Sequence, residues 1–222
     1  MIHFDSDYTA GAHPEVLSRL VATNAEHTAG YGNDPYTAHA KALIREAIGS
    51  ADAEVMFLVG GTQTNATAID GLLSRWEGVL AAESGHIAVH EAGAIEASGH
   101  KVLTLPHYAG KVKAEDVEHY IAEFYADETY PHMVAPGMLY ISQPTEYGTI
   151  YSRSELEALS EVCHRRNIPL YIDGARLGYA LAAEGADFTL SDISRLADVF
   201  YIGGTKLGNV ACKVPGHGDN IR

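Results

Sequence analysis

Two short segments near the end of the chain constrain its fold more than any other feature. Each begins with apolar and aromatic residues that favour a strand and ends with small residues and a charge: residues 171–176 read Tyr-Ile-Asp-Gly-Ala-Arg, and residues 201–206 read Tyr-Ile-Gly-Gly-Thr-Lys. This pattern is typical of buried parallel strands that carry a polar group at the carboxyl end. The interval between Asp173 and Lys206 accommodates a crossover with one helix, which predicts both charges at the same edge of one sheet.

An acid and an amine that converge at the mouth of a parallel sheet are the two groups that pyridoxal phosphate requires. The amine of Lys206 would form the Schiff base, and the carboxylate of Asp173 would pair with the pyridinium nitrogen. That pairing keeps the ring nitrogen protonated, so that the ring can act as an electron sink. We therefore predict pyridoxal phosphate as the cofactor, with both residues in its binding site and in catalysis.

Composition limits the class of protein. A chain of 222 residues can form one sizeable α/β domain or a core domain with a small appendage. Its net charge of −14 argues against nucleic acid or an anionic membrane surface as partners. Two cysteines, Cys163 and Cys212, form no disulfide framework, and neither a signal-peptide pattern nor an apolar run of membrane-spanning length is present. We expect a cytoplasmic protein with a small-molecule substrate.

Strand and helix patterns alternate along the chain. Apolar runs predict strands that end at residues 59, 89, 105, 142, 172 and 202. Helical spacing or capping signals predict helices at residues 14–21, 35–48, from after Asn65 to about 76, 114–127, 152–162, 176–181 and within 187–196. Asp34 and Gly49 are the expected caps of the second helix, and residues 152–155 have the pattern of a capping box. The expected apolar faces consist of Val16, Leu17, Leu20 and Val21; of Val117, Ile121 and Phe124; and of Leu156, Leu159 and Val162. We therefore expect the α/β class, with a mostly parallel sheet covered by helices on both faces and with ligands at the carboxyl ends of the strands.

A glycine-rich segment follows the first predicted strand. Residues 60–65 read Gly-Gly-Thr-Gln-Thr-Asn and lead into a helix, whose free N–H groups and positive dipole end favour an anion. The segment lacks the Gly-Lys-Ser/Thr ending of a Walker loop, and taken alone it is equally consistent with a plain tight turn. Beside a lysine that forms a Schiff base, the interpretation as a phosphate-binding cup is favoured.

His86, His90 and Glu91 form a second polar cluster. Their order is not that of the His-Glu-x-x-His zinc helix, and no third cluster completes a ligand set, so we predict no metal. For each histidine, a solvated or hydrogen-bonded ring is the simplest interpretation. The functional alternative is an imidazole stacked over a planar cofactor. The polar residues 143–146 follow another predicted strand, where a structural turn is the simplest interpretation.

Several segments together resemble a known family. They are residues 5–7, 31–35, 60–65, 91–93, 173–176 and 203–206. In this order they resemble the low-specificity threonine aldolases, which belong to the aromatic amino acid β-eliminating lyase/threonine aldolase family of fold-type-I pyridoxal-phosphate enzymes. The resemblance covers about residues 3–208, and the Asp-Gly-Ala-Arg and Gly-Thr-Gln segments are its most specific parts together.

The resemblance implies roles for individual residues. It implies that Lys206 forms the Schiff base, that Asp173 pairs with the ring nitrogen and that Gly61 and Thr62 bind the phosphate. Of the two histidines it selects His86, five residues before the glutamate, as the ring-stacking and catalytic residue.

The resemblance also implies substrate contacts. Arg176 would bind the cofactor's phenolic oxygen or the substrate carboxylate, and Ser6 would help to hold that carboxylate. Tyr31 would reach the site of a neighbouring subunit, because the family forms dimers or tetramers with shared active sites. On residues alone, Tyr31 is more simply a packing residue.

The implied reaction cleaves the Cα–Cβ bond of threonine, allo-threonine or a related β-hydroxy amino acid, releasing an aldehyde and glycine. His86, a water molecule or a second histidine are all candidates for the base that accepts the β-hydroxyl proton. Two alternatives stay open: another fold-type-I reaction, such as β-elimination or transamination, and a non-catalytic remnant. Analysis of the reaction products distinguishes the aldolase reaction from the other fold-type-I reactions.

The last residues depart from the family pattern. The family continues after Gly208 into a small C-terminal domain that supplies a further arginine, whereas residues 209–222 show little strand or helix pattern. We therefore expect residues 1–208 to form the cofactor-binding large domain and residues 209–222 to be an atypical truncated tail, with the small domain missing. We also expect weak activity, or none, from the chain alone.

Overall fold

A single six-stranded sheet organises the computed structural model of this chain, which describes residues 6–208 and 215–217. The strands are β1 (Glu77–Ala82), β2 (Val102–Leu105), β3 (Ala135–Ser142), β4 (Leu170–Asp173), β5 (Val199–Tyr201) and β6 (Pro215–His217), arranged in the order β2-β1-β3-β4-β5-β6. The first five are parallel, and β6 pairs antiparallel with β5. The predicted α/β class with a mostly parallel sheet is therefore confirmed.

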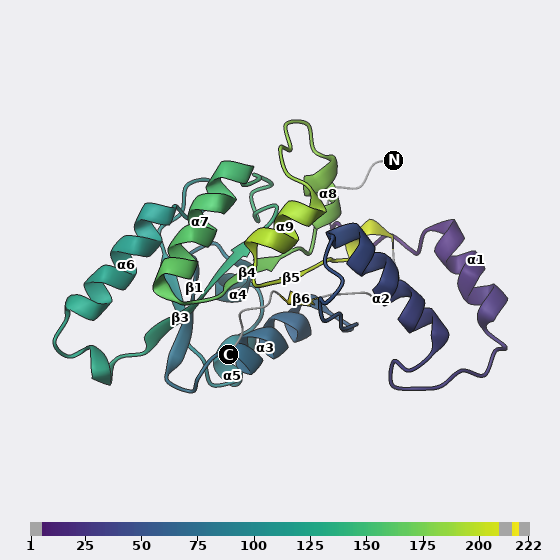
Figure 1. The fold of residues 1–222 in the computed structure, drawn as a ribbon, viewed down its shortest axis with the longest axis horizontal. Helices are drawn as coiled ribbons and strands as arrows, with labels where there is room; N and C mark the ends of the chain where they lie inside the picture. The colour runs from purple at the N-terminus through teal and green to yellow at the C-terminus, as the bar shows by residue number, and fades with distance from the viewer. Residues whose placement is uncertain (1–5, 209–214, 218–222) are drawn as a thin grey trace.

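Helices cover both faces of the sheet (Figure 1). They are α1 (Pro14–Thr23), α2 (Pro35–Ile48), α3 (Gly61–Leu72), α4 (His86–Val89), α5 (Ala94–Ala97), α6 (Ala114–Ala126), α7 (Arg153–Arg166), α8 (Leu177–Ala182) and α9 (Leu190–Leu196). Helices α6, α7 and α9 lie over one face, and α3 and α5 over the other. Side chains of a strand alternate between faces, so Leu80 of β1 joins the core under α6 and α7 while Val79 joins the core under α3.

The amphipathic spacing of α6 and α7 produces the larger core. Val117 and Ile121 of α6 are buried as predicted, as are Leu156 and Leu159 of α7. The predicted capping box starts α7, since the Ser152 hydroxyl accepts the N–H of Glu155 and the Glu155 side chain accepts the N–H of Ser152. Local sequence signals therefore suffice to place these two helices.

The predicted strand at residues 55–59 is not formed. Only Val55 is buried, whereas Met56 is 55% and Val59 is 77% exposed. A strand requires a hydrogen-bonded neighbour, and this segment joins no ladder among the described residues. The prediction used apolar composition, which does not show whether a partner strand is available.

The predicted strand at residues 87–89 is also wrong, because these residues belong to helix α4. The strand that precedes them is β1, which lies between β2 and β3 and which the sequence analysis missed. Helix α3 ends at Leu72 and not near residue 76, so the chain has room for β1. Its sequence, Glu-Gly-Val-Leu-Ala-Ala, contains a single β-branched residue and gives a weak strand signal.

Strands β4 and β5 are adjacent and parallel, with Tyr171 opposite Val199. Their crossover contains two helices, α8 and α9, which agree with the helical patterns predicted at residues 176–181 and within 187–196. Two glycines allow the segments after the strands to approach closely. A Cβ atom on Gly174 would lie 1.9 Å from the Tyr201 carbonyl oxygen, and one on Gly203 would lie 2.4 Å from the Ala175 carbonyl oxygen. Both predicted charges therefore follow neighbouring strands at one edge of the sheet.

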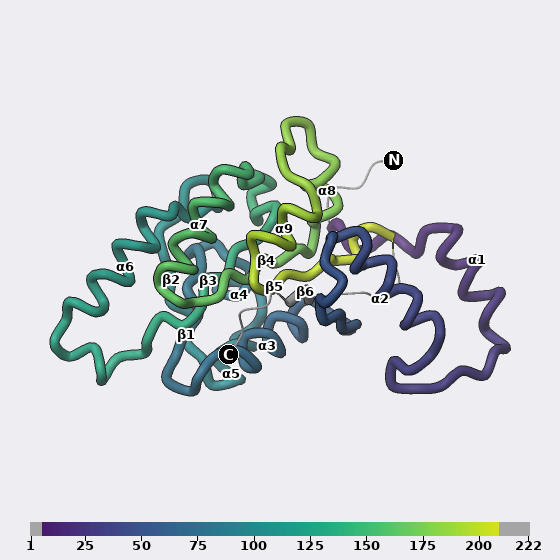
Figure 2. The backbone as a smooth tube through the Cα atoms, in the orientation of Figure 1, coloured from purple at the N-terminus to yellow at the C-terminus, as the bar shows by residue number. Residues whose placement is uncertain are grey.

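The N-terminal helices extend to one side of the sheet (Figure 2). Helix α1 buries none of its residues, and Leu20 and Val21 of its predicted apolar face are 48% and 72% exposed. Asp34 and Gly49 cap α2 as predicted. Among the described residues, no helix combines the length and the apolar character needed to cross a membrane.

The tail was predicted to have little regular structure, but residues 215–217 form β6 along the edge of β5. The rest of the predicted tail, residues 209–214 and 218–222, lies outside the described residues. A three-residue strand is too short to produce a recognisable alternation in the sequence.

Candidate active site

Asp173 lies at the centre of the polar edge of the sheet. It is the last residue of β4, and its side chain is buried. One carboxylate oxygen, Oδ1, accepts the backbone N–H of Ala175 at 2.9 Å. The other, Oδ2, accepts the Tyr140 hydroxyl at 2.6 Å and the Asn65 amide at 3.1 Å. These donors hold the carboxylate, and the side chain of Tyr201 is a further hydrogen-bond partner of Asp173. Among the described residues, no arginine or lysine forms an ion pair with it.

Asn65 connects Asp173 with a second buried carboxylate. It lies on the second turn of α3, fully buried, and its Nδ2 also donates to Glu91 Oε1 at 2.7 Å. Its Oδ1 accepts the hydroxyl of Tyr171 at 2.7 Å. The amide orientation is thereby determined, because a flipped amide would direct its oxygen at two carboxylates.

His86 completes this side of the site. It opens helix α4, and its Nδ1 lies 2.7 Å from Oε1 of the buried Glu91. Because a carboxylate accepts hydrogen bonds, Nδ1 of His86 carries the proton in this contact. The His86 side chain is 35% exposed, so its ring is accessible from the open side of the site.

Glu146 contacts the backbone of His86. Its Oε1 accepts the backbone N–H of His86 at 2.9 Å and the Ser142 hydroxyl at 2.6 Å. The Ser142 oxygen lies 3.4 Å from the Tyr140 hydroxyl. Polar contacts thus form a circuit through seven residues: His86, Glu91, Asn65, Asp173, Tyr140, Ser142 and Glu146.

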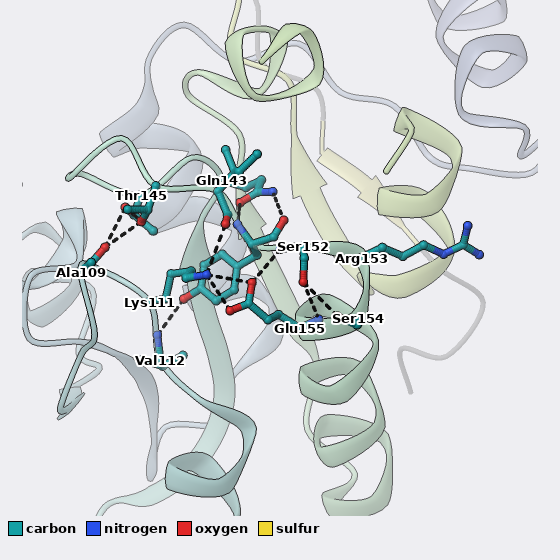
Figure 3. A network of polar contacts seen from close by, with 12 residues as sticks. Ala109, Lys111, Val112, Gln143, Thr145, Ser152, Arg153, Ser154 and Glu155 are labelled. Carbon is teal, nitrogen blue, oxygen red and sulfur yellow. Dashed lines mark hydrogen bonds and ion pairs between the residues drawn. The ribbon is translucent and has the colours of Figure 1, made fainter. Parts of the chain in front are cut away.

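Hydrogen bonds hold the loop that carries Glu146, and an ion pair lies beside it (Figure 3). Gln143 and Tyr151 exchange hydrogen bonds of 3.0 and 2.9 Å across the loop, and the Thr145 hydroxyl contacts the Ala109 carbonyl oxygen. The Lys111 ammonium group lies 2.6 Å from a carboxylate oxygen of Glu155, at the start of α7. The turn predicted for residues 143–146 is therefore held by these contacts, and it also places Glu146 next to the backbone of His86.

Lys206 lies in a 3₁₀ turn after β5 and is half-buried. Burial lowers the pKa of its amine, and the positive charge of Arg176 lowers it further. The charges of Asp7, Asp173 and Glu146 act in the opposite direction without cancelling the shift. The structure thus brings the predicted Lys206 and Asp173 into one electrostatic environment.

Arg176 caps α8 and forms an ion pair with Asp7, through Nε to Oδ2 and through a second contact of 3.3 Å to Oδ1. Burial raises the pKa of the Asp7 carboxyl, but the Arg176 hydrogen bond and the charges of Lys206 and Arg176 outweigh this effect and hold the pKa below its ordinary value. Beside Asp7, the hydroxyl oxygen of Ser6 is buried without a hydrogen-bond partner in the described part of the chain. Ser6 is therefore the chain neighbour of the residue that pairs with Arg176.

The predicted phosphate binders stand at the amino end of α3. Gly60 caps the helix, and Gly61 and Thr62 occupy its first turn, where backbone N–H groups lack helical partners. The first helical hydrogen bond runs from the Thr64 N–H to the Gly60 oxygen at 2.9 Å. This helix end and Asn65 belong to one element, so the predicted phosphate cup has a fixed relation to Asp173.

Tyr31 is the one predicted site residue that this chain does not bring to the site. It is fully exposed in the loop between α1 and α2, in a left-handed conformation with φ of 60°. That loop lies far from the carboxyl edge of the sheet (Figure 1). Across residues 6–208, moreover, no three His, Cys, Asp or Glu side chains are grouped as a metal site would require.

Comparison with known proteins identifies the family. A family model described as beta-eliminating lyase matches residues 3–212, which is most of the chain. The chain belongs to the beta-eliminating lyase family.

Curated relatives of the chain include low specificity L-threonine aldolases. The chain is 33% identical over 207 residues to the low specificity L-threonine aldolase of Pseudomonas aeruginosa, and 27% identical over 213 residues to that of Escherichia coli K12. These matches cover 92% and 91% of this chain but 58% of each relative. The chain therefore spans less than two thirds of the length of these lyases.

Solved structures agree with this assignment. The match to a threonine aldolase of Leishmania major has a TM-score of 0.91 at 44% identity and covers 96% of this chain and 61% of that one. An aspartate aminotransferase of Thermus thermophilus matches with a TM-score of 0.70 at 16% identity, which supports the fold alone. The predicted fold-type-I architecture is confirmed.

Sequence reasoning missed several residues of this beta-eliminating lyase site. Asn65 stood inside the glycine-rich segment that was read for phosphate binding, and Asp7 stood beside the predicted Ser6. Tyr140 was read only as a strand residue. A polar or hydroxyl group at the end of a buried strand was the available signal for Tyr140 and Ser142, but the sequence does not show which side chains meet.

Proposed function

We propose that the chain carries the cofactor-binding and catalytic part of a pyridoxal-phosphate-dependent aldehyde-lyase. Its substrates would be threonine, allo-threonine or related β-hydroxy amino acids, cleaved to glycine and an aldehyde. The observation that carries the proposal is the placement of Asp173 and Lys206 after adjacent parallel strands, in a chain of the beta-eliminating lyase family. The names of the curated relatives support the reaction.

The residues present fit pyridoxal phosphate. Lys206 offers an amine for a Schiff base, Asp173 a buried carboxylate for the ring nitrogen, His86 an accessible flat ring, and Gly61 and Thr62 free N–H groups for the phosphate. When bound, the cofactor supplies an electron sink for the charge left on Cα after the carbon–carbon bond breaks.

The chain's own residues prepare this chemistry. The lowered pKa of Lys206 increases the uncharged fraction of its amine, which is the form that reacts with an aldehyde. Hydrogen bonds from Asn65, Tyr140 and the backbone N–H of Ala175 orient Asp173. Arg176 already binds one carboxylate, that of Asp7, and its guanidinium carries further donors for a substrate carboxylate beside Ser6.

The test is cofactor capture followed by product analysis. The chain is incubated with pyridoxal phosphate, treated with borohydride and digested; we expect the label on the Lys206 peptide. Threonine and allo-threonine are then assayed for glycine and aldehyde, whereas β-elimination or transamination would produce a keto acid. Label at Lys101, Lys111 or Lys113 in place of Lys206, or keto acid as the product, contradicts the proposal.

We also propose that the protein works as a cytoplasmic homodimer or homotetramer. The unburied apolar face of α1 supports self-association, and the exposed Tyr31 is available to a neighbouring subunit. The buried, unpaired Cys163 is compatible with a reducing compartment.

A further inference from the structure

We propose that Asn65 is a positioning residue that couples His86, through Glu91, to Asp173. The inference rests on the proposed function, in which His86 and Asp173 contact two different parts of one cofactor ring. Asn65 would then keep these two contacts in one fixed relation, although it touches neither the reacting atoms nor His86 itself.

The hydrogen bonds of Asn65 support this role. Its single Nδ2 donates to Glu91 Oε1 at 2.7 Å and to Asp173 Oδ2 at 3.1 Å, so that both N–H bonds are used on carboxylates from distant parts of the chain. Glu91 Oε1 in turn lies 2.7 Å from Nδ1 of His86. Asn65, Glu91 and Asp173 are all buried, so water does not replace these contacts.

Electrostatics makes the amide necessary. Glu91 and Asp173 bring two like charges to one amide, and no lysine or arginine forms an ion pair with either among the described residues. Like charges in a poorly screened interior repel, and the two N–H dipoles of Asn65 offset part of that repulsion. An apolar side chain of the same size would fill the volume and leave the repulsion.

The remaining contacts prevent Asn65 from adapting. Tyr171 donates to Asn65 Oδ1 at 2.7 Å, which locks the amide orientation. Glu91 Oε2 is buried without a hydrogen-bond partner in the described residues, so Asn65 and His86 are the donors that hold Glu91. Loss of Asn65 therefore leaves His86 as the donor to Glu91 among the described residues and removes one of the donors to Asp173.

The test is a double-mutant cycle in the cofactor-free chain of 222 residues. The reporter is the Nδ1 proton resonance of His86, observed by NMR in ¹⁵N-histidine-labelled protein and assigned with His86→Gln. Asp173→Asn should shift this resonance when Asn65 is present. In an Asn65→Leu background, the same substitution should shift it by less than a quarter as much.

Control variants distinguish coupling between His86 and Asp173 from non-specific structural perturbation. Ser160→Ala removes another buried hydrogen bond, to the Leu196 carbonyl oxygen, far along α7, and should leave the His86 resonance and its response to Asp173→Asn unchanged. Where leucine prevents folding, as judged by circular dichroism, Asn65→Ser is used, since serine has one donor and can serve only one carboxylate. An equal shift in both backgrounds, or no shift in either, overturns the proposal.

A second measurement uses pyridoxal phosphate labelled with ¹⁵N at the ring nitrogen. We expect a pyridinium-like resonance in the parent and a displacement toward the neutral pyridine in Asn65→Leu. An unchanged resonance in this variant counts against positioning. If the parent binds no pyridoxal phosphate, the proposed function fails, whereas the cycle in the cofactor-free chain still decides the role of Asn65.

Discussion

Individual side chains at this site act through their neighbours. Asp173 is oriented by Tyr140, Asn65 and the backbone of residue 175, and Lys206 shares its environment with Arg176. Substitutions of these neighbouring residues should therefore change the reactivity of Asp173 or Lys206. Two predictions follow at this scale, one for the amine and one for the carboxylate.

Capture of pyridoxal phosphate by Lys206 should have a shifted pH dependence. A lowered pKa increases the uncharged amine at a given pH, so the rate–pH curve should lie at lower pH than that of a free lysine amide. Arg176→Gln removes a charge that lowers the pKa and should move the curve to higher pH. Asp7→Asn removes a charge that raises it and should move the curve to lower pH. Displacements in the same direction for both variants would contradict this account.

Asp173→Asn preserves shape and removes the charge. We expect turnover of threonine to fall by roughly 3 kcal/mol in barrier height, about a hundredfold, as for loss of one preorganised electrostatic contact. The dissociation constant of pyridoxal phosphate should change much less. The measurement is kcat in a full-length family member that carries this residue, beside a cofactor titration, and an unchanged kcat refutes the proposed role.

At the scale of elements, the loop after β3 depends on a small polar network. The Tyr151 hydroxyl accepts the backbone N–H of Val112 at 2.8 Å, and both residues are buried. This contact joins the segment before α6 to the segment before α7, and the same loop presents Glu146 to His86. Stability and site geometry are therefore linked through residues that have no part in the chemistry.

Tyr151→Phe should destabilise the fold by about 1–3 kcal/mol, because it leaves a buried N–H without an acceptor. Urea unfolding measures the effect. Tyr125→Phe is the matched control, since the Tyr125 side chain is 53% exposed and its recorded contacts are with the rings of Phe124 and Tyr130. We expect that control to stay within 0.5 kcal/mol of the parent, and equal effects at the two tyrosines would show that the hydrogen bond is unimportant.

At the scale of the whole molecule, the N-terminal helices are the least buried part of the fold. Leu17, Leu20 and Val21 form an apolar stripe on α1 that is not buried in the described chain. Such a stripe favours association between copies.

Val21→Glu should therefore reduce self-association, which sedimentation velocity measures over a range of concentrations. Met133→Glu, at another exposed apolar residue beyond α6, is the control and should leave the sedimentation unchanged. Identical sedimentation of Val21→Glu and the parent would remove α1 from the interface.

Agreement between sequence and structure varied with the type of signal. Short-range signals were reliable: the Ser152 capping box, the Asp34 cap and the buried stripe of α7 all form as predicted. Signals for strands, which need a neighbouring strand to pair with, were not reliable. The apolar run at residues 55–59 forms no strand, and β1 was missed although it lies inside the sheet.

By itself, the sequence determined the α/β class, the common edge for Asp173 and Lys206, and the glycines that let those segments approach. These features depend on the periodicity of apolar residues, on the lengths of the connections and on local steric limits, all of which can be read directly from the order of the residues. The tertiary structure alone decided that Asn65 joins Glu91 to Asp173, that Asp7 pairs with Arg176, and that Tyr31 lies away from the site. Such contacts join residues that are far apart in the chain. Which of them meet depends on the direction and the burial of each side chain, and no local sequence pattern encodes these.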